Sequence, residues 1–167
     1  MKCKSTFRNL LLYILLLTFS LSACMKKNND PYTCNYDPCE LKAPESEVKA
    51  LEAFLLSKNI TATKHCSGLY YEILNPGADV SPAVCSAIAV TYKGTLTDGT
   101  VFDQSTTPRT FSLITLIEGW KKGLLQLKKG GKIRLYVPPS LGYGSTTSGA
   151  IPGNSILLFD IDLLDLR

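Results

Sequence analysis

The sequence predicts an α+β domain whose sheet is mostly antiparallel and has five strands. Five short runs of apolar and β-branched residues are separated by turns rich in Gly, Pro and Asn, which is the pattern of short strands. One amphipathic stretch, suited to a short helix, lies between the third and fourth runs. The dipeptide Asp98-Gly99 between the second and third runs favours a tight hairpin and therefore antiparallel pairing. Consecutive strands with a single helix among them are typical of the α+β class.

Residues 1–23 predict an export signal. Three basic residues precede a mostly leucine run over residues 10–21, and this order is typical of a cleavable signal peptide. A membrane-spanning helix needs about 20 apolar residues, so the run is too short for one. The tetrad Leu-Ser-Ala-Cys that ends at Cys24 resembles the lipobox of bacterial lipoproteins. The resemblance implies cleavage before Cys24 and lipidation of Cys24, which would anchor the chain in a membrane. The alternative is an ordinary secretory signal followed by a chance cysteine.

Residues 24–43 are expected to comprise the lipidated Cys24 and a flexible tether, because the stretch is polar and contains turn signals. No aspartate directly follows Cys24, and by analogy with enterobacterial sorting this favours the outer membrane. The expected location is therefore the bacterial cell envelope, with the protein lipid-anchored and facing the periplasm.

Four further cysteines lie at Cys34, Cys39, Cys66 and Cys85. In an oxidising compartment they suggest two disulfides, and the three possible pairings stay open. A metal site is the weaker reading, because no Cys-x-x-Cys spacing occurs and the single histidine lies in a polar linker. Unpaired structural thiols are the remaining alternative.

Residues 44–66 predict an N-terminal helix, over residues 44–59, and a linker. Val48, Leu51 and Leu55 recur at helical spacing, so one face of the helix is apolar. Packing of this face on the main domain is the favoured reading and a dimerising helix is the alternative. The helix is short for a dimer interface, so a monomer is expected.

The remaining elements follow in order along residues 67–167. The expected strands are residues 69–74, 87–96, 101–103 with a continuation over 110–113 after an interruption at Pro108, 132–137 and 155–166. A short helix is expected within residues 116–129, where Trp120, Leu124 and Leu127 share one face before a Gly-Gly stop. Residues 140–154, rich in Gly and Ser, predict a loop.

Composition and motifs exclude several classes of function. The formal net charge is +4, but three basic residues lie in residues 1–23, and the other 15 of the 18 basic side chains face 14 acidic ones. A nearly neutral body gives no electrostatic reason to expect nucleic-acid binding. The sequence contains no Gly-x-Ser-x-Gly elbow, no phosphate-binding loop and no dinucleotide-binding glycine pattern. Neither a cofactor nor a metal is expected. Asp160, Asp162 and Asp165 are interpreted as a solvated strand face, with a cation site as the alternative.

Six separated motifs resemble the FKBP family over residues 68–166. Residues 90–105 read VTYKGTLTDGTVFDQS and resemble V-x-Y-x-G-x-L-x-D-G-x-x-F-D-x-S, and residues 117–124, IEGWKKGL, resemble I-x-G-W-x-x-G-L. The other matches are GGKIRLYVP at 130–138, LGYG at 141–144, IP at 151–152 and LFDIDLL at 158–164. One such motif would mean little, whereas six in the family's order make a chance match very improbable.

The resemblance implies a sheet wrapped around one short helix, with an apolar hollow between them. It implies that residues 67–167 are a peptidyl-prolyl cis-trans isomerase domain acting on X-Pro bonds of exported, folding proteins, with unfolded proline-containing polypeptides as partners and macrolide inhibitors as candidate ligands. A membrane-anchored FKBP-like chaperone or binding module with little isomerase activity is the alternative. The implied catalytic residues are Tyr92, Phe102, Asp103, Trp120, Tyr143 and Phe159, and the implied substrate-binding residues are Leu116, Ile117 and Ile151.

Two departures from the family pattern concern the walls of that hollow. Many relatives carry a phenylalanine where this chain has Arg109 or Thr110, so one wall is not accounted for. Residues 144–150 differ in length and composition from the best-known members, and no large insertion of the kind that forms a chaperone flap occurs there.

Overall fold

The computed structural model describes residues 34–166, which form a six-stranded antiparallel sheet with two α-helices. The elements are α2 (Glu45–Ser57), β1 (Thr63–Lys64), β2 (Tyr70–Asn75), β3 (Ala87–Leu96), β4 (Val101–Ser112), the 3-10 turn η1 (Leu113–Thr115), α3 (Glu118–Leu124), β5 (Lys132–Val137), the 3-10 turn η2 (Pro139–Leu141) and β6 (Leu157–Leu166). The α+β class is confirmed. The strand number is six instead of five, because the two-residue β1, in the predicted linker, pairs with β2.

The predicted signal peptide, Cys24 and residues 25–33 of the predicted tether lie outside the described residues. Of the helices between residues 34 and 166, none has both the length and the apolar character that a membrane span requires.

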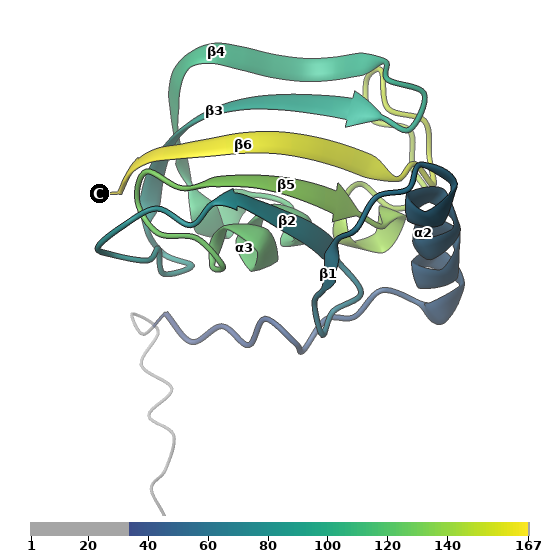
Figure 1. Ribbon diagram of the computed structural model, residues 1–167, viewed down its shortest axis with the longest axis horizontal. Helices are drawn as coiled ribbons and strands as arrows, with labels where there is room; N and C mark the ends of the chain where they lie inside the picture. The colour runs from purple at the N-terminus through teal and green to yellow at the C-terminus, as the bar shows by residue number, and fades with distance from the viewer. Residues whose placement is uncertain (1–33, 167) are drawn as a thin grey trace, which may run out of the picture. The chain divides into compact units, whose positions relative to one another are not determined.

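The strands lie in the order β1-β2-β5-β6-β3-β4 (Figure 1). Because β6 pairs with both β5 and β3, it is a central strand and not, as expected, close to an edge. Asp160 and Asp162 lie on a partly exposed face of the sheet beside basic residues of β5, and Asp160 pairs with Arg134 at 2.6 Å and Asp162 with Lys132 at 3.2 Å. Cross-strand ion pairs of this kind stabilise antiparallel sheets.

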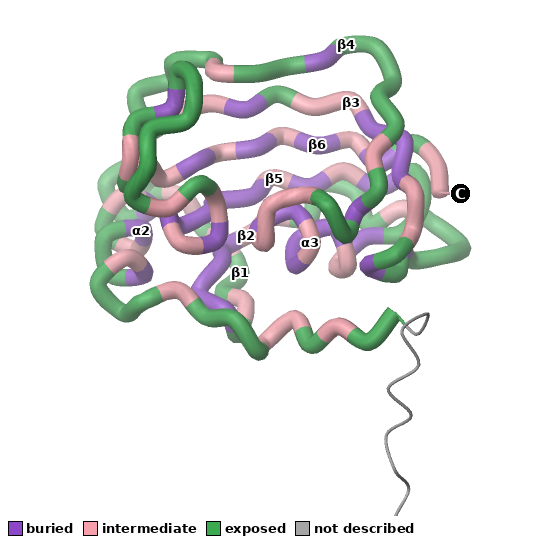
Figure 2. The backbone as a smooth tube through the Cα atoms, turned by 180° about the vertical axis from the view of Figure 1, so that it is seen from behind, coloured by how far each residue is buried: buried purple, intermediate pink, exposed green. Residues whose placement is uncertain are grey.

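Strand β4 continues through Pro108, where an interruption was predicted. The register of β3 and β4 shifts between Val90, opposite Arg109, and Tyr92, opposite Ser105, so extra residues of β4 bulge out. Proline has no N–H to donate to a ladder and is tolerated in bulges and edge strands. The proline thus bends this mostly exposed outer strand (Figure 2) without ending it.

Helix α3 lies directly against β5, and two glycines permit the close approach. A Cβ atom at Gly119 would lie 2.6 Å from Cγ1 of Val137, and one at Gly123 would lie 2.4 Å from Cδ2 of Leu135. Either contact is too short for a real Cβ, so larger residues would push the helix off the sheet. Helix α3 covers one face of the sheet, and α2 stands at its end (Figure 1).

The apolar stripe of α2 is covered by the chain itself. Val48, Leu51 and Leu55 are buried in a cluster with Tyr70 and Tyr136 of the sheet. Packing on the main domain therefore accounts for these three side chains.

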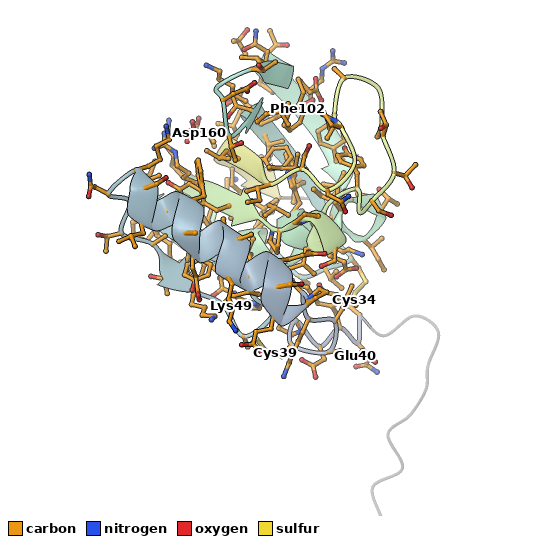
Figure 3. The ribbon with its side chains drawn as sticks, turned by 90° about the vertical axis from the view of Figure 1, so that its right-hand side faces the viewer. Cys34, Cys39, Glu40, Lys49, Phe102 and Asp160 are labelled. Atoms are coloured by element: carbon orange, nitrogen blue, oxygen red, sulfur yellow. A yellow bond between two sulfur atoms is a disulfide. The ribbon has the colours of Figure 1, made fainter. Side chains whose placement is uncertain are left out.

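Two disulfides, Cys34–Cys85 and Cys39–Cys66, join the segment 34–43 to the body. This segment was expected to belong to the flexible tether, but the structure ties it down beside α2 (Figure 3). The loops that the two bonds close span 51 and 27 residues. In the chain-entropy account, bonds of this separation stabilise the fold by about 4 kcal/mol each.

Candidate functional site

A cavity of about 310 Å³ opens beside the start of α3. Its lining comes from β3, β4, η1, α3, β6 and the loop after η2, and consists of Tyr92, Phe102, Asp103, Phe111, Thr115, Leu116, Ile117, Trp120, Tyr143 and Phe159. Eight of the nine residues expected at the hollow therefore lie around one cavity, although they come from five separated segments.

The Trp120 indole forms the floor of the cavity and is 5% exposed. Three rings stand edge-on to it, with centroids at 5.3 Å for Tyr92, 5.4 Å for Phe159 and 6.2 Å for Phe111. Perpendicular contacts at these distances are favourable for aromatic rings. The indole is consequently held from three sides and presents a rigid apolar surface.

Phe102 and Phe159 form a second wall, with ring centroids 5.4 Å apart and nearly perpendicular planes. Gly94 of β3 lies against both rings, and a Cβ there would come within 2.5 Å of Cε2 of Phe102. The glycine thus leaves room for the Phe102 ring, which Figure 3 labels. This explains why a strand otherwise rich in larger residues contains Gly94.

The one carboxylate in the lining, Asp103, accepts a hydrogen bond from the Tyr92 hydroxyl at 2.7 Å. Burial, and then the hydrogen bond to Asp103, raise the pKa of Tyr92 to about 12. The phenol therefore stays protonated at neutral pH and acts as the donor. The pair fixes a polar edge on an otherwise apolar wall.

Two polar groups near the cavity are left free for a ligand. The hydroxyl of Tyr143, a residue 43% exposed, has no hydrogen-bond partner among residues 34–166. Burial, and secondarily the charge of Asp103, raise the pKa of Tyr143, so this hydroxyl also remains a donor. The amide of Ile117, at the N-cap position of α3, donates to no main-chain acceptor in the described part of the chain.

Sequence reasoning missed Phe111 and Thr115, and Ile151 is the one expected residue that does not line the cavity. Phe111 lies 6.1 Å from Tyr92 and closes the wall that Arg109 and Thr110 had left unaccounted for. The available signal was an aromatic residue in the predicted 110–113 strand, but the β4 bulge decides which of these side chains faces the cavity. Ile151 was expected at the rim; it is 6% exposed and packs in the main core, outside the cavity lining.

The described residues bring one group of metal-ligand types together. Ligand atoms of Cys39, His65 and Cys66 lie within 4.8 Å of one another. The two sulfur atoms are bonded to each other, however, and Nδ1 of His65 lies 2.9 Å from the Ser67 hydroxyl oxygen. A disulfide offers no thiolate to a metal, so in the present structure this group is a turn cross-linked by a disulfide.

Comparison with known proteins points to one family. Residues 79–164 match the family described as FKBP-type peptidyl-prolyl cis-trans isomerase. The FKBP-type peptidyl-prolyl cis-trans isomerase FkpA of Escherichia coli strain K12 is 40% identical over 134 residues, which cover 77% of this chain and 49% of that protein. The chain therefore spans about half the length of this curated relative.

Two solved structures are similar in fold. The crystal structure of FkpA from E. coli has a TM-score of 0.65 at 39% identity, covering 74% of this chain and 58% of that one. A peptidyl-prolyl cis-trans isomerase from Pseudomonas syringae also has a TM-score of 0.65, at 32% identity, and covers 75% of this chain and 98% of its own.

Proposed function

Because this chain belongs to the FKBP-type peptidyl-prolyl cis-trans isomerase family, we propose that its cavity catalyses rotation about X-Pro bonds in unfolded, proline-containing polypeptides. The observation that carries the proposal is the ring-lined cavity of about 310 Å³, with the Trp120 indole as its floor. Its size and its mostly aromatic lining suit a proline ring with its preceding peptide group.

The chemistry that this cavity has to perform needs no covalent step. Rotation of an X-Pro bond has a barrier of about 20 kcal/mol, which comes from the lost resonance of the amide. In the twisted transition state the carbonyl is less polar than in the planar amide. Water solvates the planar amide better than the twisted one, and an apolar enclosure does not. The barrier to rotation is therefore lower in the enclosure than in water. The aromatic lining supplies such an enclosure.

The lining residues divide this work between contact and orientation. Trp120 and Phe159 hold the proline ring by apolar contact. The Ile117 amide and the Tyr143 hydroxyl, both without partners among residues 34–166, donate to carbonyl groups of the substrate. These two hydrogen bonds hold the substrate backbone on either side of the X-Pro bond and so orient that bond in the cavity. Asp103 keeps the Tyr92 ring in place through its hydrogen bond and transfers no proton.

The proposed setting is the bacterial cell envelope. Two disulfides in the described residues suit an oxidising compartment, and the basic, leucine-rich start of the sequence with its Leu-Ser-Ala-Cys tetrad suits export and lipidation at Cys24. The proposed partners are exported chains during folding, the outer membrane through the lipid, and macrolide inhibitors in the cavity. A monomer is proposed, since the α2 stripe is covered within the chain.

The test is isomerisation of a proline-containing peptide by the chain without residues 1–24. We expect acceleration by the wild type, near-complete loss in Trp120→Ala, and full activity in the control Leu56→Ala, since Leu56 is 79% exposed and outside the cavity. If a folded wild type left the uncatalysed rate unchanged, the proposal would fail in favour of a binding module or chaperone with little isomerase activity.

A further inference from the structure

The segment 34–43, called here the N-terminal strap, reaches helix α3 through Tyr36. The Tyr36 hydroxyl donates to Oε2 of Glu118 at 2.8 Å, across 82 residues of sequence. The cysteines on either side of Tyr36 in the sequence form disulfides with the body, Cys34 with Cys85 and Cys39 with Cys66. The tyrosine therefore lies on a short stretch of chain whose two ends are held covalently.

At the same point the strap covers a buried cation. The Lys122 side chain is 0% exposed and pairs with Glu118 at 3.1 Å. Its Nζ also donates to the Tyr36 hydroxyl oxygen at 3.0 Å and lies 5.1 Å from the centroid of the Tyr36 ring. A buried charge is costly unless it is paired and hydrogen-bonded. Tyr36 supplies both an acceptor and an aromatic face, and together with Glu118 it compensates the buried charge of Lys122.

The Tyr36 hydroxyl donates a hydrogen bond to Glu118 and accepts one from Lys122. Burial, followed by the hydrogen bond to Glu118, raises the pKa of Tyr36 well above its ordinary value. The phenol thus keeps its proton, and the three groups form a closed network between the strap and α3. Lys121 joins the same carboxylate at 2.5 Å.

These contacts fall on the part of α3 that builds the cavity. Glu118 directly follows Ile117, whose amide is free to meet a ligand, and lies two residues before Trp120 of the floor. The helix has seven residues and no side-chain cap at its N-cap residue Ile117. A helix this short is not stable by itself and depends on tertiary contacts. The network with Tyr36 is such a contact, at the turn that carries both cavity residues.

We propose that Tyr36 is a positioning residue for the cavity: by holding Glu118 and Lys122 it sets the place of the Ile117 amide and the Trp120 indole. The part of this inference that concerns turnover rests on the proposed isomerase function. The part that concerns the geometry of the cavity does not.

The chain contains a chemically matched control. The Tyr70 hydroxyl donates to Oε1 of Glu52, Lys64 pairs with the same carboxylate at 2.8 Å, and its Nζ lies 5.7 Å from the Tyr70 ring centroid. This second Tyr-Glu-Lys group joins β1 and β2 to α2, and none of its three residues lines the cavity. Tyr36→Phe and Tyr70→Phe therefore remove the same kind of hydroxyl, one beside the cavity helix and one away from it.

Two measurements on the full chain, purified in detergent, separate positioning from stability. Trp120 is the single tryptophan of the protein, so emission excited at a wavelength that tyrosine does not absorb reports on the cavity floor. We expect Tyr36→Phe to shift the emission maximum to longer wavelength, and to raise the KM for a proline-containing peptide several-fold with a smaller change in kcat. Tyr70→Phe is expected to leave the spectrum and KM as in the wild type. Thermal unfolding measures whether each variant is folded at the temperature of the assay.

The proposal is overturned if Tyr36→Phe, folded, has the wild-type spectrum, or if Tyr70→Phe shifts the spectrum as much. If the wild type lacked isomerase activity, the proposed function would fail, and the spectra of the two variants would still decide the positioning claim. Glu118→Gln keeps an acceptor for the Tyr36 hydroxyl and is expected to shift the emission maximum less than Glu118→Ala, whereas an equal shift in both would also overturn the proposal.

Discussion

The Tyr92 hydroxyl and the Asp103 carboxylate are joined at 2.7 Å across neighbouring strands β3 and β4. The pair lies at the edge of a cavity that is otherwise aromatic and apolar. Its geometry makes Asp103 an acceptor for a phenol that stays protonated, since the pKa of Tyr92 is raised to about 12 by burial and by the hydrogen bond. A holding role, and not proton transfer, follows from this arrangement.

Asp103→Ala is expected to reduce isomerase activity only partly, by roughly fivefold, because one hydrogen bond of about 1 kcal/mol is lost while the aromatic walls remain. The pH profile of kcat/KM should stay flat across the neutral range in both proteins. A steep bell-shaped profile in the wild type that disappears in Asp103→Ala would contradict the holding role. Tyr92→Phe, which removes the donor instead of the acceptor, should resemble Asp103→Ala.

Phe111→Leu is expected to weaken peptide binding, because it removes the ring that lies 6.1 Å from Tyr92 and 6.2 Å from Trp120. The KM for a proline-containing peptide should rise several-fold. Phe54→Leu is the matched control, since Phe54 is also partly buried but packs against the α2 cluster. Peptide kinetics compare the two variants, and an equal rise in KM would remove Phe111 from the site.

Loss of either disulfide is expected to destabilise the fold by about 4 kcal/mol, as the chain-entropy account predicts for loops of 51 and 27 residues. The double variant Cys34→Ser/Cys85→Ser, which opens the longer loop, should lose about 0.6 kcal/mol more free energy of unfolding than Cys39→Ser/Cys66→Ser. Urea unfolding of the two double variants measures the difference. Unchanged stability in both would show that the strap contributes nothing to the folded body.

Stability is expected to fall as the pH drops below 6.5, partly through His65. Burial, and then the charge of Lys122, lower the pKa of His65 from its ordinary 6.5. Below that pH the unfolded chain binds a proton that the folded protein does not yet bind, so the unfolded state is favoured. His65→Gln should flatten this dependence down to the lowered pKa. Urea unfolding at a series of pH values checks it, and an unchanged slope in the variant would count against it.

Acyl labelling in living cells tests the proposed anchor. With radiolabelled palmitate we expect the wild type to be labelled and Cys24→Ala not to be, because the thiol of Cys24 is the proposed lipid attachment point. Cys66→Ser serves as a control for a general effect of losing a cysteine. An unlabelled wild type would remove the lipoprotein proposal and leave the isomerase proposal untouched.

Local patterns were sufficient for most of the fold. The β-branched run and the Asp98-Gly99 turn predicted β3 and its hairpin with β4, and the amphipathic stretch predicted a short helix, although α3 ends at Leu124, before the Gly-Gly stop. Strands and helices are specified by such short-range preferences. The six motifs also contain Trp120 and six other residues that the structure places around the cavity.

What the sequence by itself determined is therefore the class of the fold, the place of its main strands and most of the cavity's side chains. Only the tertiary structure decided the pairing of the four cysteines, the entry of Phe111 into the wall, the burial of Ile151 in the core and the contact of Tyr36 with Lys122. Each of these depends on the path of the chain between distant segments or on a bulge in the ladder. Local periodicity carries no information about which distant side chains meet, because that is settled by how the whole chain packs.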